Sequence, residues 1–438
     1  MAGRGPAIGH TGRVDRFVVT PNGPLGGTVR AGGAKNSVLK LMAACLLAEG
    51  RHVLTNVPRI TDVDTMADVL RAMGVTVERG ADDELVVDVP GTVVPEAPLA
   101  LVERIRASVV VLGPLLARAG KVSVGLPGGD DFGPRPIDMH LAALESLGAT
   151  FDASDGVVEG VVVSTDAGRR RLVGTQVVLD YPSHTGTDNV LMAAVLAKGT
   201  TVIENAAREP EVCDLAAYLR SMGAKIAGAG TSRIVVEGVE ALHPATHRVV
   251  PDRLVVATFL VAAGLTGGDV LVEDGRPEHM ELLLRKLSCA GIEVSSGPDG
   301  LRARRDPSRR LRAVDVATLP FPGFATDYKP LMVTLLTVAD GVGIVTENLF
   351  FGRFRYVDEL RRMGADIRTE GHHAVVSGVD RLSGAAVRAL DVRAGAAMVL
   401  AGLVADGETV VAGAHHVDRG YEDFDGRLAA LGAKVLRD

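Results

Sequence analysis

The chain has 438 residues, of which 47% are apolar and 3% aromatic, and it contains no tryptophan. This length predicts two to four domains, and the composition argues against disorder and for a core built from Ala, Val and Leu. The formal net charge of −7 argues against a general nucleic-acid or membrane-surface binder, so locally clustered arginines would have to hold any anionic ligand.

The cysteines and the hydropathy pattern indicate the cellular compartment. Cys45, Cys213 and Cys289 are odd in number, widely separated and set in apolar helical patterns, which predicts reduced, buried thiols. Residues 1–9 lack an apolar stretch of signal-peptide length, and no window reaches about eighteen uninterrupted apolar residues. We therefore expect a soluble, cytoplasmic protein.

The strongest pattern is an internal repeat in which a helix ends at a glycine and a β-branched strand follows. It occurs at Gly74, Gly148, Gly223, Gly291, Gly364 and Gly432, so successive glycines are 68–75 residues apart. Each glycine lies where a left-handed helix cap is favourable. The even spacing predicts six small α/β units, divided into two domains of three.

Loops with a basic residue precede several apolar helices. Residues 27–36 end in Gly-Gly-Ala-Lys-Asn before an expected helix from Ser37, and Arg104 and Arg106 precede an expected helix at 107–114. A helix N-terminus exposes backbone N–H groups and the positive end of the helix dipole, so it favours an anion. The glycine and lysine spacing of a P-loop is missing.

The segment 126–140 reads Leu-Pro-Gly-Gly-Asp-Asp-Phe-Gly-Pro-Arg-Pro-Ile-Asp-Met-His. Gly128 and Gly129 permit a sharp turn, and the prolines on either side of Arg135 stiffen the backbone there. Such a loop is typical of a lid over an anionic ligand. The alternative is an acidic surface turn between two elements.

Further loops of this kind follow. Residues 181–189 (Tyr-Pro-Ser-His-Thr-Gly-Thr-Asp-Asn) precede an apolar helix and offer hydroxyl groups to a phosphate or diphosphate. Asp327 follows proline and aromatic residues, where a raised pKa would suit a general base, although an aspartate before a helix is often an N-cap. Arg353, Arg393 and Arg419 lie near turns, with surface ion pairs as the alternative for the last two.

If these helix starts converge, they form an electropositive cleft in an acidic protein, which indicates an enzyme that closes two domains over anionic substrates. The His pairs at 372–373 and 415–416 lack Cys or carboxylate partners at zinc-ligand spacing, so no metal site is expected. The Gly-x-Ser-x-Gly and Rossmann glycine patterns do not occur, which disfavours hydrolases and dehydrogenases.

Six motifs resemble those of the UDP-N-acetylglucosamine enolpyruvyl transferase family, in the same order. They are Gly-Gly-Ala-Lys35-Asn36, Arg106-Ala-Ser, Leu-Pro-Gly-Gly-Asp130-x-x-Gly-x-Arg135-Pro, Asn205-Ala-Ala-Arg-Glu-Pro, Phe-Pro-Gly-Phe-x-Thr-Asp327 and Asp418-Arg419-Gly-Tyr. The related 5-enolpyruvylshikimate-3-phosphate synthases share the fold but not these motifs.

The resemblance implies an α/β fold, a two-domain inside-out α/β barrel with six βαβαββ repeats, three per domain. One domain is expected to comprise residues 1–34 plus 251–438 and to carry Asp327 on the phosphoenolpyruvate side. The other is expected to comprise residues 35–250, with the lid loop 126–140.

The resemblance also implies an addition–elimination reaction. A hydroxyl of a uridine nucleotide, the 3-hydroxyl of UDP-N-acetylglucosamine in peptidoglycan precursor synthesis, attacks C2 of phosphoenolpyruvate while C3 is protonated, and phosphate leaves. The expected partners are these two small molecules, without nucleic acid or membrane, and no metal or organic cofactor is implied. By matching motif the catalytic residues are Lys35, Asp130 and Asp327, with Asp327 as general base.

The remaining site residues are implied in the same way. Basic residues would bind phosphoenolpyruvate: Lys35, Arg106, Arg135, Arg353, Arg393 and Arg419. The acceptor would be bound by Asn36, Arg135, Pro136, Ile137, Asp138, Met139, His140, Ser183, His184, Thr185, Asp327 and Leu349.

Four departures from the family pattern bear on the chemistry. Asp130 replaces the usual lid cysteine, which predicts insensitivity to fosfomycin, an epoxide that alkylates this cysteine. Residues 183–186 read Ser-His-Thr-Gly instead of Ser-Val-Gly-Ala, residues 350–353 read Phe-Phe-Gly-Arg instead of Phe-Glu-Asn/Ala-Arg, and Lys329 replaces a glutamine. Because the second and third changes lie in loops that handle the sugar diphosphate, the ribose 3′-hydroxyl of UMP, as in nucleoside antibiotic biosynthesis, is the alternative acceptor. A non-catalytic repeat scaffold is a remote third hypothesis.

Overall fold

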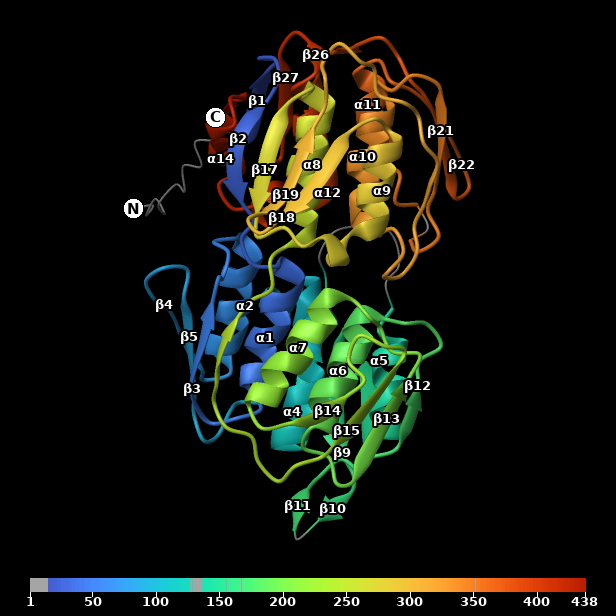
Figure 1. The fold of residues 1–438 in the computed structure, drawn as a ribbon. Coiled ribbons are helices and arrows are strands. Elements are labelled where there is room, and N and C mark those ends of the chain that lie inside the picture. Colours follow the sequence, from blue (N-terminus) through green and yellow to red (C-terminus); the bar gives the residue numbers. More distant parts are fainter. Residues whose placement is uncertain (1–14, 127, 129–135, 155, 167, 351) are drawn as a thin grey trace, which may run out of the picture.

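The structure is a computed structural model that describes residues 15–126, 128, 136–154, 156–166, 168–350 and 352–438. Figure 1 shows two lobes, one above the other. The hydrophobic core of one lobe extends from Val38 to Val249, and that of the other combines Phe17–Ala31 with Leu254–Val435. We call residues 34–250 the N-terminal lobe, and residues 15–33 with 251–438 the C-terminal lobe.

Six four-stranded sheets share one topology. We number the three main strands of a unit in chain order after its core helix; in the last unit β1 takes the third place. In each sheet an edge strand pairs in parallel with the first strand, and the first strand pairs antiparallel with the third. The third strand pairs antiparallel with the second, which forms the other edge. The first and third strands alternate buried and more exposed side chains, as expected for a sheet with one face on the core.

The sheets of the N-terminal lobe, from the parallel edge onwards, are β16 (Thr246–Arg248), β3 (Gly50–Thr55), β5 (Leu85–Val89), β4 (Thr76–Arg79); β6 (Glu96–Ala97), β7 (Lys121–Gly125), β9 (Val157–Val162), β8 (Ala149–Ser154); and β12 (Gln176–Val178), β13 (Thr200–Glu204), β15 (Arg233–Glu237), β14 (Lys225–Ala227). Those of the C-terminal lobe are β2 (Gly26–Arg30), β17 (Asp269–Glu273), β19 (Gly300–Arg304), β18 (Glu293–Gly297); β20 (Val316–Ala317), β21 (Val342–Thr346), β23 (His373–Ser377), β22 (Asp366–Glu370); and β25 (Ala386–Arg388), β27 (Thr409–Ala412), β1 (Arg16–Thr20), β28 (Lys434–Arg437).

Each unit has one core helix before its first strand and one outer helix after it. The core helices are α1 (Lys35–Cys45), α4 (Leu112–Ala119), α6 (His184–Ala194), α8 (Arg253–Thr266), α10 (Lys329–Leu336) and α12 (Val392–Gly402). The outer helices are α2 (Thr61–Ala72), α5 (Asp138–Ser146), α7 (Pro210–Ser221), α9 (Glu281–Cys289), α11 (Val357–Arg362) and α14 (Phe424–Ala430). Shorter elements are α3 (Leu99–Val102), α13 (His415–Asp418), the 3-10 helices Arg106–Val111, Pro277–His279 and Thr326–Tyr328, and the strand pairs β10 (Thr165–Asp166) with β11 (Arg169–Arg170) and β24 (Leu382–Ser383) with β26 (Ala405–Asp406).

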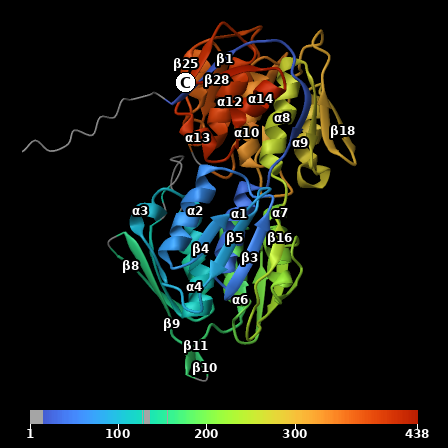
Figure 2. The ribbon, with the colours of Figure 1, turned by 90° about the vertical axis from the view of Figure 1, so that its left-hand side faces the viewer.

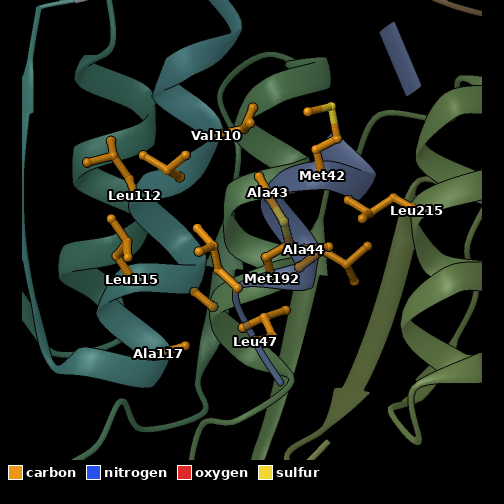
Figure 3. Packing of buried hydrophobic residues seen from close by; sticks show 14 of the residues in the cluster. Met42, Ala43, Ala44, Leu47, Val110, Leu112, Leu115, Ala117, Met192 and Leu215 are labelled. Atoms are coloured by element: carbon orange, nitrogen blue, oxygen red, sulfur yellow. The ribbon is translucent and has the colours of Figure 1, made fainter. Parts of the chain in front are cut away.

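The core helices are buried at the centre of each lobe on nearly all faces, while the sheets lie outside them. Figure 3 shows Ala43 and Ala44 of α1 among Leu115 of α4 and Met192 of α6, all of which belong to one core. Alanines at the contacts let helices pack closely, which compensates for the scarcity of aromatic residues. The predicted inside-out architecture is confirmed.

The six repeat glycines follow the six outer helices and all have positive φ: Gly74 87°, Gly148 97°, Gly223 104°, Gly291 95°, Gly364 88° and Gly432 98°. In this region of the backbone a side chain is strained and glycine is not. The predicted left-handed caps, and with them the sixfold repeat, are confirmed.

The chain enters and leaves the N-terminal lobe at one place. Strand β1 supplies the third strand of the last sheet of the C-terminal lobe, and β2 supplies the parallel edge of the first, so the N-terminal lobe is inserted between β2 and β17. Figure 2 shows β1 in blue beside the red β28. The two crossing segments pair: Ala34 N donates to the Val250 carbonyl at 2.7 Å and Asp252 N to the Gly32 carbonyl at 2.9 Å. A Cβ at Gly33 would lie 1.9 Å from the Asn56 carbonyl oxygen, so only glycine fits at this crossing.

The thiols differ from the prediction in one respect. Cys45 is buried and Cys213 partly buried, but Cys289 is exposed because it ends the outer helix α9 on the solvent side. Within the described ranges, no helix is both long and apolar enough to traverse a bilayer.

Candidate active site

The core helices of both lobes begin at one cavity of about 560 Å³. Its lining includes a side chain from the start of each: Lys35 (α1), Arg106 (the 3-10 helix before α4), His184 (α6), Arg253 (α8), Asp327 (the 3-10 helix before α10) and Arg393 (α12). Of the described lining residues, seven are Lys or Arg and five are Asp or Glu, in a chain of net charge −7. Helix dipoles and cations therefore combine to favour anions here, and the predicted convergence of helix starts is confirmed.

Most predicted site residues that the structure describes line this cavity. They are Lys35, Asn36, Arg106, Pro136, Asp138, Met139, His140, Ser183, His184, Thr185, Asp327, Leu349, Arg353, Arg393 and Arg419. Ile137 lies in the hydrophobic core of the N-terminal lobe, where it is 8% exposed. Asp130 and Arg135 lie outside the described residues.

Lys35 and Arg419 approach one carboxylate from different lobes. Asp62, in the first turn of α2, accepts from Lys35 Nζ at 2.6 Å and from Arg419 Nε at 2.9 Å. Burial acts to raise the pKa of Asp62, but Lys35 and Arg419 outweigh it and hold the pKa below its usual value. Two of the cations predicted to bind phosphoenolpyruvate, Lys35 and Arg419, thus already bind one anionic group.

Asp327 is held by two buried guanidinium groups. Its Oδ1 lies 2.9 Å from a terminal nitrogen of Arg353, and its Oδ2 lies 3.3 Å from Nε of Arg393, while its side chain stays 25% exposed to the cavity. Burial acts to raise the pKa of Asp327, but Arg353 and Arg393 outweigh it and hold the pKa well below its usual range. The expected raised pKa is therefore wrong, because the sequence showed proline and aromatic neighbours but not the arginines.

Two neutral histidines lie on the opposite, N-terminal-lobe side. Burial, reinforced by Arg106, lowers the pKa of His140 to about 4, and burial, reinforced by Lys40, lowers that of His184 to about 3. Asn189 Nδ2 lies 3.1 Å from His140 Nδ1, so the network assigns the proton to Nε2, which donates to the Thr185 hydroxyl at 3.2 Å. Neutral imidazoles can bind hydroxyl or phosphate groups without adding charge.

The residue that begins α6 shows how a helix start is prepared for an anion. Ser183 is the N-cap of α6, and its hydroxyl accepts from the Gly186 N–H at 3.1 Å. The cap fixes the first turn while the helix start stays on the cavity wall.

Sequence reasoning missed the buried acids that organise the site. Besides Asp62, Glu211 of α7 binds Arg253 of α8 at 3.0 Å across the lobes, and Asp188 binds Lys40 at 2.9 Å beneath the cavity. Each acid lies on a helix far along the chain from its partner, so no local spacing signals the pair. Among the described residues, no group of three or more His, Cys, Asp or Glu side chains is arranged to hold a metal ion.

Comparison with known proteins shows which family the chain belongs to. The model of the family described as EPSP synthase (3-phosphoshikimate 1-carboxyvinyltransferase) matches residues 19–428. The UDP-N-acetylglucosamine 1-carboxyvinyltransferase of Nocardia farcinica is 51% identical over 97% of this chain and 98% of its own, and that of Mycobacterium leprae is 50% identical over 97% and 99%.

Solved structures give the same result. The enolpyruvyl transferase NikO from Streptomyces tendae matches with a TM-score of 0.84 and 26% identity over 97% of this chain and 98% of its own. An EPSP synthase of Acinetobacter baumannii matches in fold, with a TM-score of 0.73 and 20% identity over 97% and 100%. With a family model that covers nearly the whole chain and relatives half identical to it, the chain belongs to the enolpyruvyl (1-carboxyvinyl) transferase family, alongside the UDP-N-acetylglucosamine 1-carboxyvinyltransferases.

Proposed function

We propose that the protein transfers the enolpyruvyl group of phosphoenolpyruvate to the 3-hydroxyl of UDP-N-acetylglucosamine and releases phosphate, a step of peptidoglycan precursor synthesis. The observation that carries the proposal is the single cavity that Lys35, Arg419 and the carboxylate of Asp327 line together, and to which both lobes present helix N-termini. Relatives of about half identity bear the name of this activity. The sugar nucleotide is therefore preferred to UMP as acceptor.

Phosphoenolpyruvate would lie against the cations. Lys35 and Arg419 would bind its charged groups in exchange for Asp62, with Arg135 as a further cation, and Arg106, Arg353 and Arg393 would stabilise the charge that develops. The acceptor would contact Asn36, Leu349 and residues 136–140, with its diphosphate at the start of α6.

Asp327 would take the proton of the attacking hydroxyl. Its low pKa keeps it ionised across the physiological range, which a base requires. An anionic substrate next to Arg353 and Arg393 would offset their charge and raise the pKa of Asp327 towards that of a useful base. The hydroxyl oxygen bonds to C2 as C3 gains a proton, for which Asp130 is the candidate donor; loss of the C3 proton and of phosphate then restores the double bond.

The two lobes would act as closing domains. We propose that residues 1–34 with 251–438 form one domain, residues 35–250 the other, and segment 126–140 the lid. The paired crossing at Gly33 and Pro251 and the separate cores support a hinge at this place.

Phosphate release from phosphoenolpyruvate, measured with each acceptor in turn, tests the proposal. We expect release with UDP-N-acetylglucosamine, a product carrying one enolpyruvyl group, and a loss of about 10²–10⁴-fold in Asp327→Asn. Activity should persist in excess chelator, because no step uses a metal. Turnover with UMP but not with the sugar nucleotide would overturn the acceptor, and absence of release with every acceptor would favour a scaffold.

A further inference from the structure

Lys329 is a buried lysine at the first position of α10, where the family pattern has glutamine. Its side chain is 0% exposed, and its ammonium lies 2.9 Å from Glu347 Oε2 and 4.0 Å from the centre of the Phe354 ring. The same ammonium donates to the backbone carbonyl of Arg353. A cation that is fully removed from water is costly unless such partners surround it.

Glu347, the partner of Lys329, holds the segment that lines the acceptor side of the cavity. Its Oε1 accepts from the backbone N–H groups of Leu349 at 2.8 Å and Phe350 at 3.2 Å, and from the Thr318 hydroxyl at 2.8 Å. Its Oε2 accepts from the Thr326 hydroxyl at 2.7 Å. Leu349 and Phe350 line the cavity, so one carboxylate fixes two residues of the wall.

Arg353 is bound at its side chain as well as at its backbone carbonyl. The guanidinium of Arg353 donates to the Thr326 hydroxyl at 2.9 Å and binds Asp327 Oδ1 at 2.9 Å. The backbone of Arg353 is thus bound by Lys329, and its side chain is bound through Thr326 to Glu347, which Lys329 also binds. The ring of contacts closes on Lys329, although this lysine does not itself line the cavity.

We propose that Lys329 is a positioning residue: by binding the Arg353 carbonyl and Glu347 together, it holds the guanidinium of Arg353 on Asp327, and Leu349 and Phe350 on the acceptor side of the cavity. The inference rests on the proposed function, since it gives Lys329 a task in that reaction.

The charges around the two groups make the effect measurable. Arg353 and Arg393 face Asp327, and Glu347, Arg353 and Asp391 face Lys329. Burial lowers the pKa of Lys329 to about 8, and Glu347 opposes this, so the ammonium stays charged at neutral pH. If Arg353 leaves Asp327, one of its two cations is lost and the pKa of Asp327 rises.

The test compares Lys329→Met, which keeps an unbranched side chain but has no donor, with Lys329→Gln, which has the same length as Met and keeps a donor. We expect Lys329→Met to lower kcat/KM about 10–100-fold. In the pH profile of kcat, which reports the complex in which bound anionic substrate raises the pKa of Asp327, the acid limb should move upwards. Lys329→Gln should retain most of the activity. The core variant Val376→Ala, in strand β23 of the same lobe, should lose stability without moving the acid limb.

Removing one buried charge can unfold a protein, so the double variant Lys329→Met/Glu347→Gln, which leaves no uncompensated charge, is measured as well. It should show the same loss and the same shift. An unshifted acid limb with wild-type activity in Lys329→Met or in the double variant would overturn the proposal.

Amide hydrogen exchange separates this inference from the proposed function. Leu349 and Phe350 should exchange faster in the folded variant without a donor than in wild type or Lys329→Gln, whether or not the enzyme turns over. Unchanged exchange there would contradict the positioning role. Absence of turnover in wild type, with faster exchange in the variant, would overturn the function alone.

Discussion

Asp327 shows how a largely buried carboxylate can stay ionised. Arg353 and Arg393 more than offset the cost of its burial, so its charge is secured before any substrate arrives. In the proposed function the same arginines would also bind an anionic substrate. The reactivity of Asp327 would then depend on occupancy of the cavity, and the base would stay weak until phosphoenolpyruvate is bound.

Asp130 gives a prediction that depends on chemistry alone. A carboxylate is a much poorer nucleophile than a thiolate towards the epoxide of fosfomycin, so we expect no time-dependent inactivation of the wild type. The variant Asp130→Cys should be inactivated progressively, with an adduct on the new cysteine found by mass spectrometry. An adduct on Asp130 in the wild-type protein would contradict the prediction.

At the residue scale, the sequence motifs predicted the basic residues that line the cavity but not the acidic side chains that bind them. Lys35, Arg353 and Arg419 stand in recognisable loops, but Asp62 and Glu347 lie in helix and strand ends that carry no motif. The direction of the Asp327 pKa shift depended on side chains 26 and 66 residues away, which no local pattern encodes.

The outer helices end in a way that sequence alone predicts well. A left-handed glycine followed by β-branched residues is a local signal, and each of the six copies has the expected positive φ. The prediction of a helix at 107–114 was less accurate. This segment starts as the 3-10 helix Arg106–Val111 and becomes α-helical only at Leu112. Its run of three valines restricts side-chain rotamers and weakens the α-helix there.

The cap glycines can be tested by one pair of substitutions. Gly364 has φ of 88°, and a Cβ added there would meet no other atom within 4 Å, so Gly364→Ala should cost about 1 kcal/mol in free energy of unfolding through backbone strain alone. Gly297, at the end of β18, has equally open space but no positive φ. Chemical denaturation should show no comparable loss for Gly297→Ala, and equal losses in both variants would contradict the cap argument.

The whole molecule is two halves of three repeats each that meet at their helix N-termini. Insertion of one lobe between β2 and β17 places both chain crossings side by side, next to Asp252, whose carboxylate accepts from Lys35 N at 3.1 Å and caps α8 through Leu254 N at 2.8 Å. One residue of the crossing therefore holds the first core helix of each lobe. The spacing of the repeat predicted six units in two domains of three, whereas the bounds that insert one domain into the other came only from the resemblance.

The buried pair Glu211–Arg253 spans the lobes and should contribute to their stability. Burial acts to raise the pKa of Glu211, but Arg253 outweighs it and lowers the pKa to about 2. A carboxyl whose folded pKa lies below its unfolded value stabilises the fold above its unfolded pKa and loses this effect as pH falls towards 2. Glu211→Gln should thus cost about 3–5 kcal/mol at pH 7, because Arg253 stays buried without its partner.

Denaturation at several pH values checks this sign. The difference between wild type and Glu211→Gln should shrink as the pH falls below the usual range of a glutamate, and a difference that grows towards acid would be inconsistent with the pair. Asp269 and Arg302 form an ion pair that is also bidentate but is exposed. Asp269→Asn should therefore lower the free energy of unfolding far less.

A crystal structure with phosphoenolpyruvate and UDP-N-acetylglucosamine bound would examine the main claim most directly. We predict phosphoenolpyruvate within hydrogen-bond distance of Lys35 and Arg419, and the sugar 3-hydroxyl about 3 Å from a carboxylate oxygen of Asp327. Ligands bound away from the helix N-termini, or a sugar hydroxyl that points away from Asp327 in a closed complex, would contradict the account.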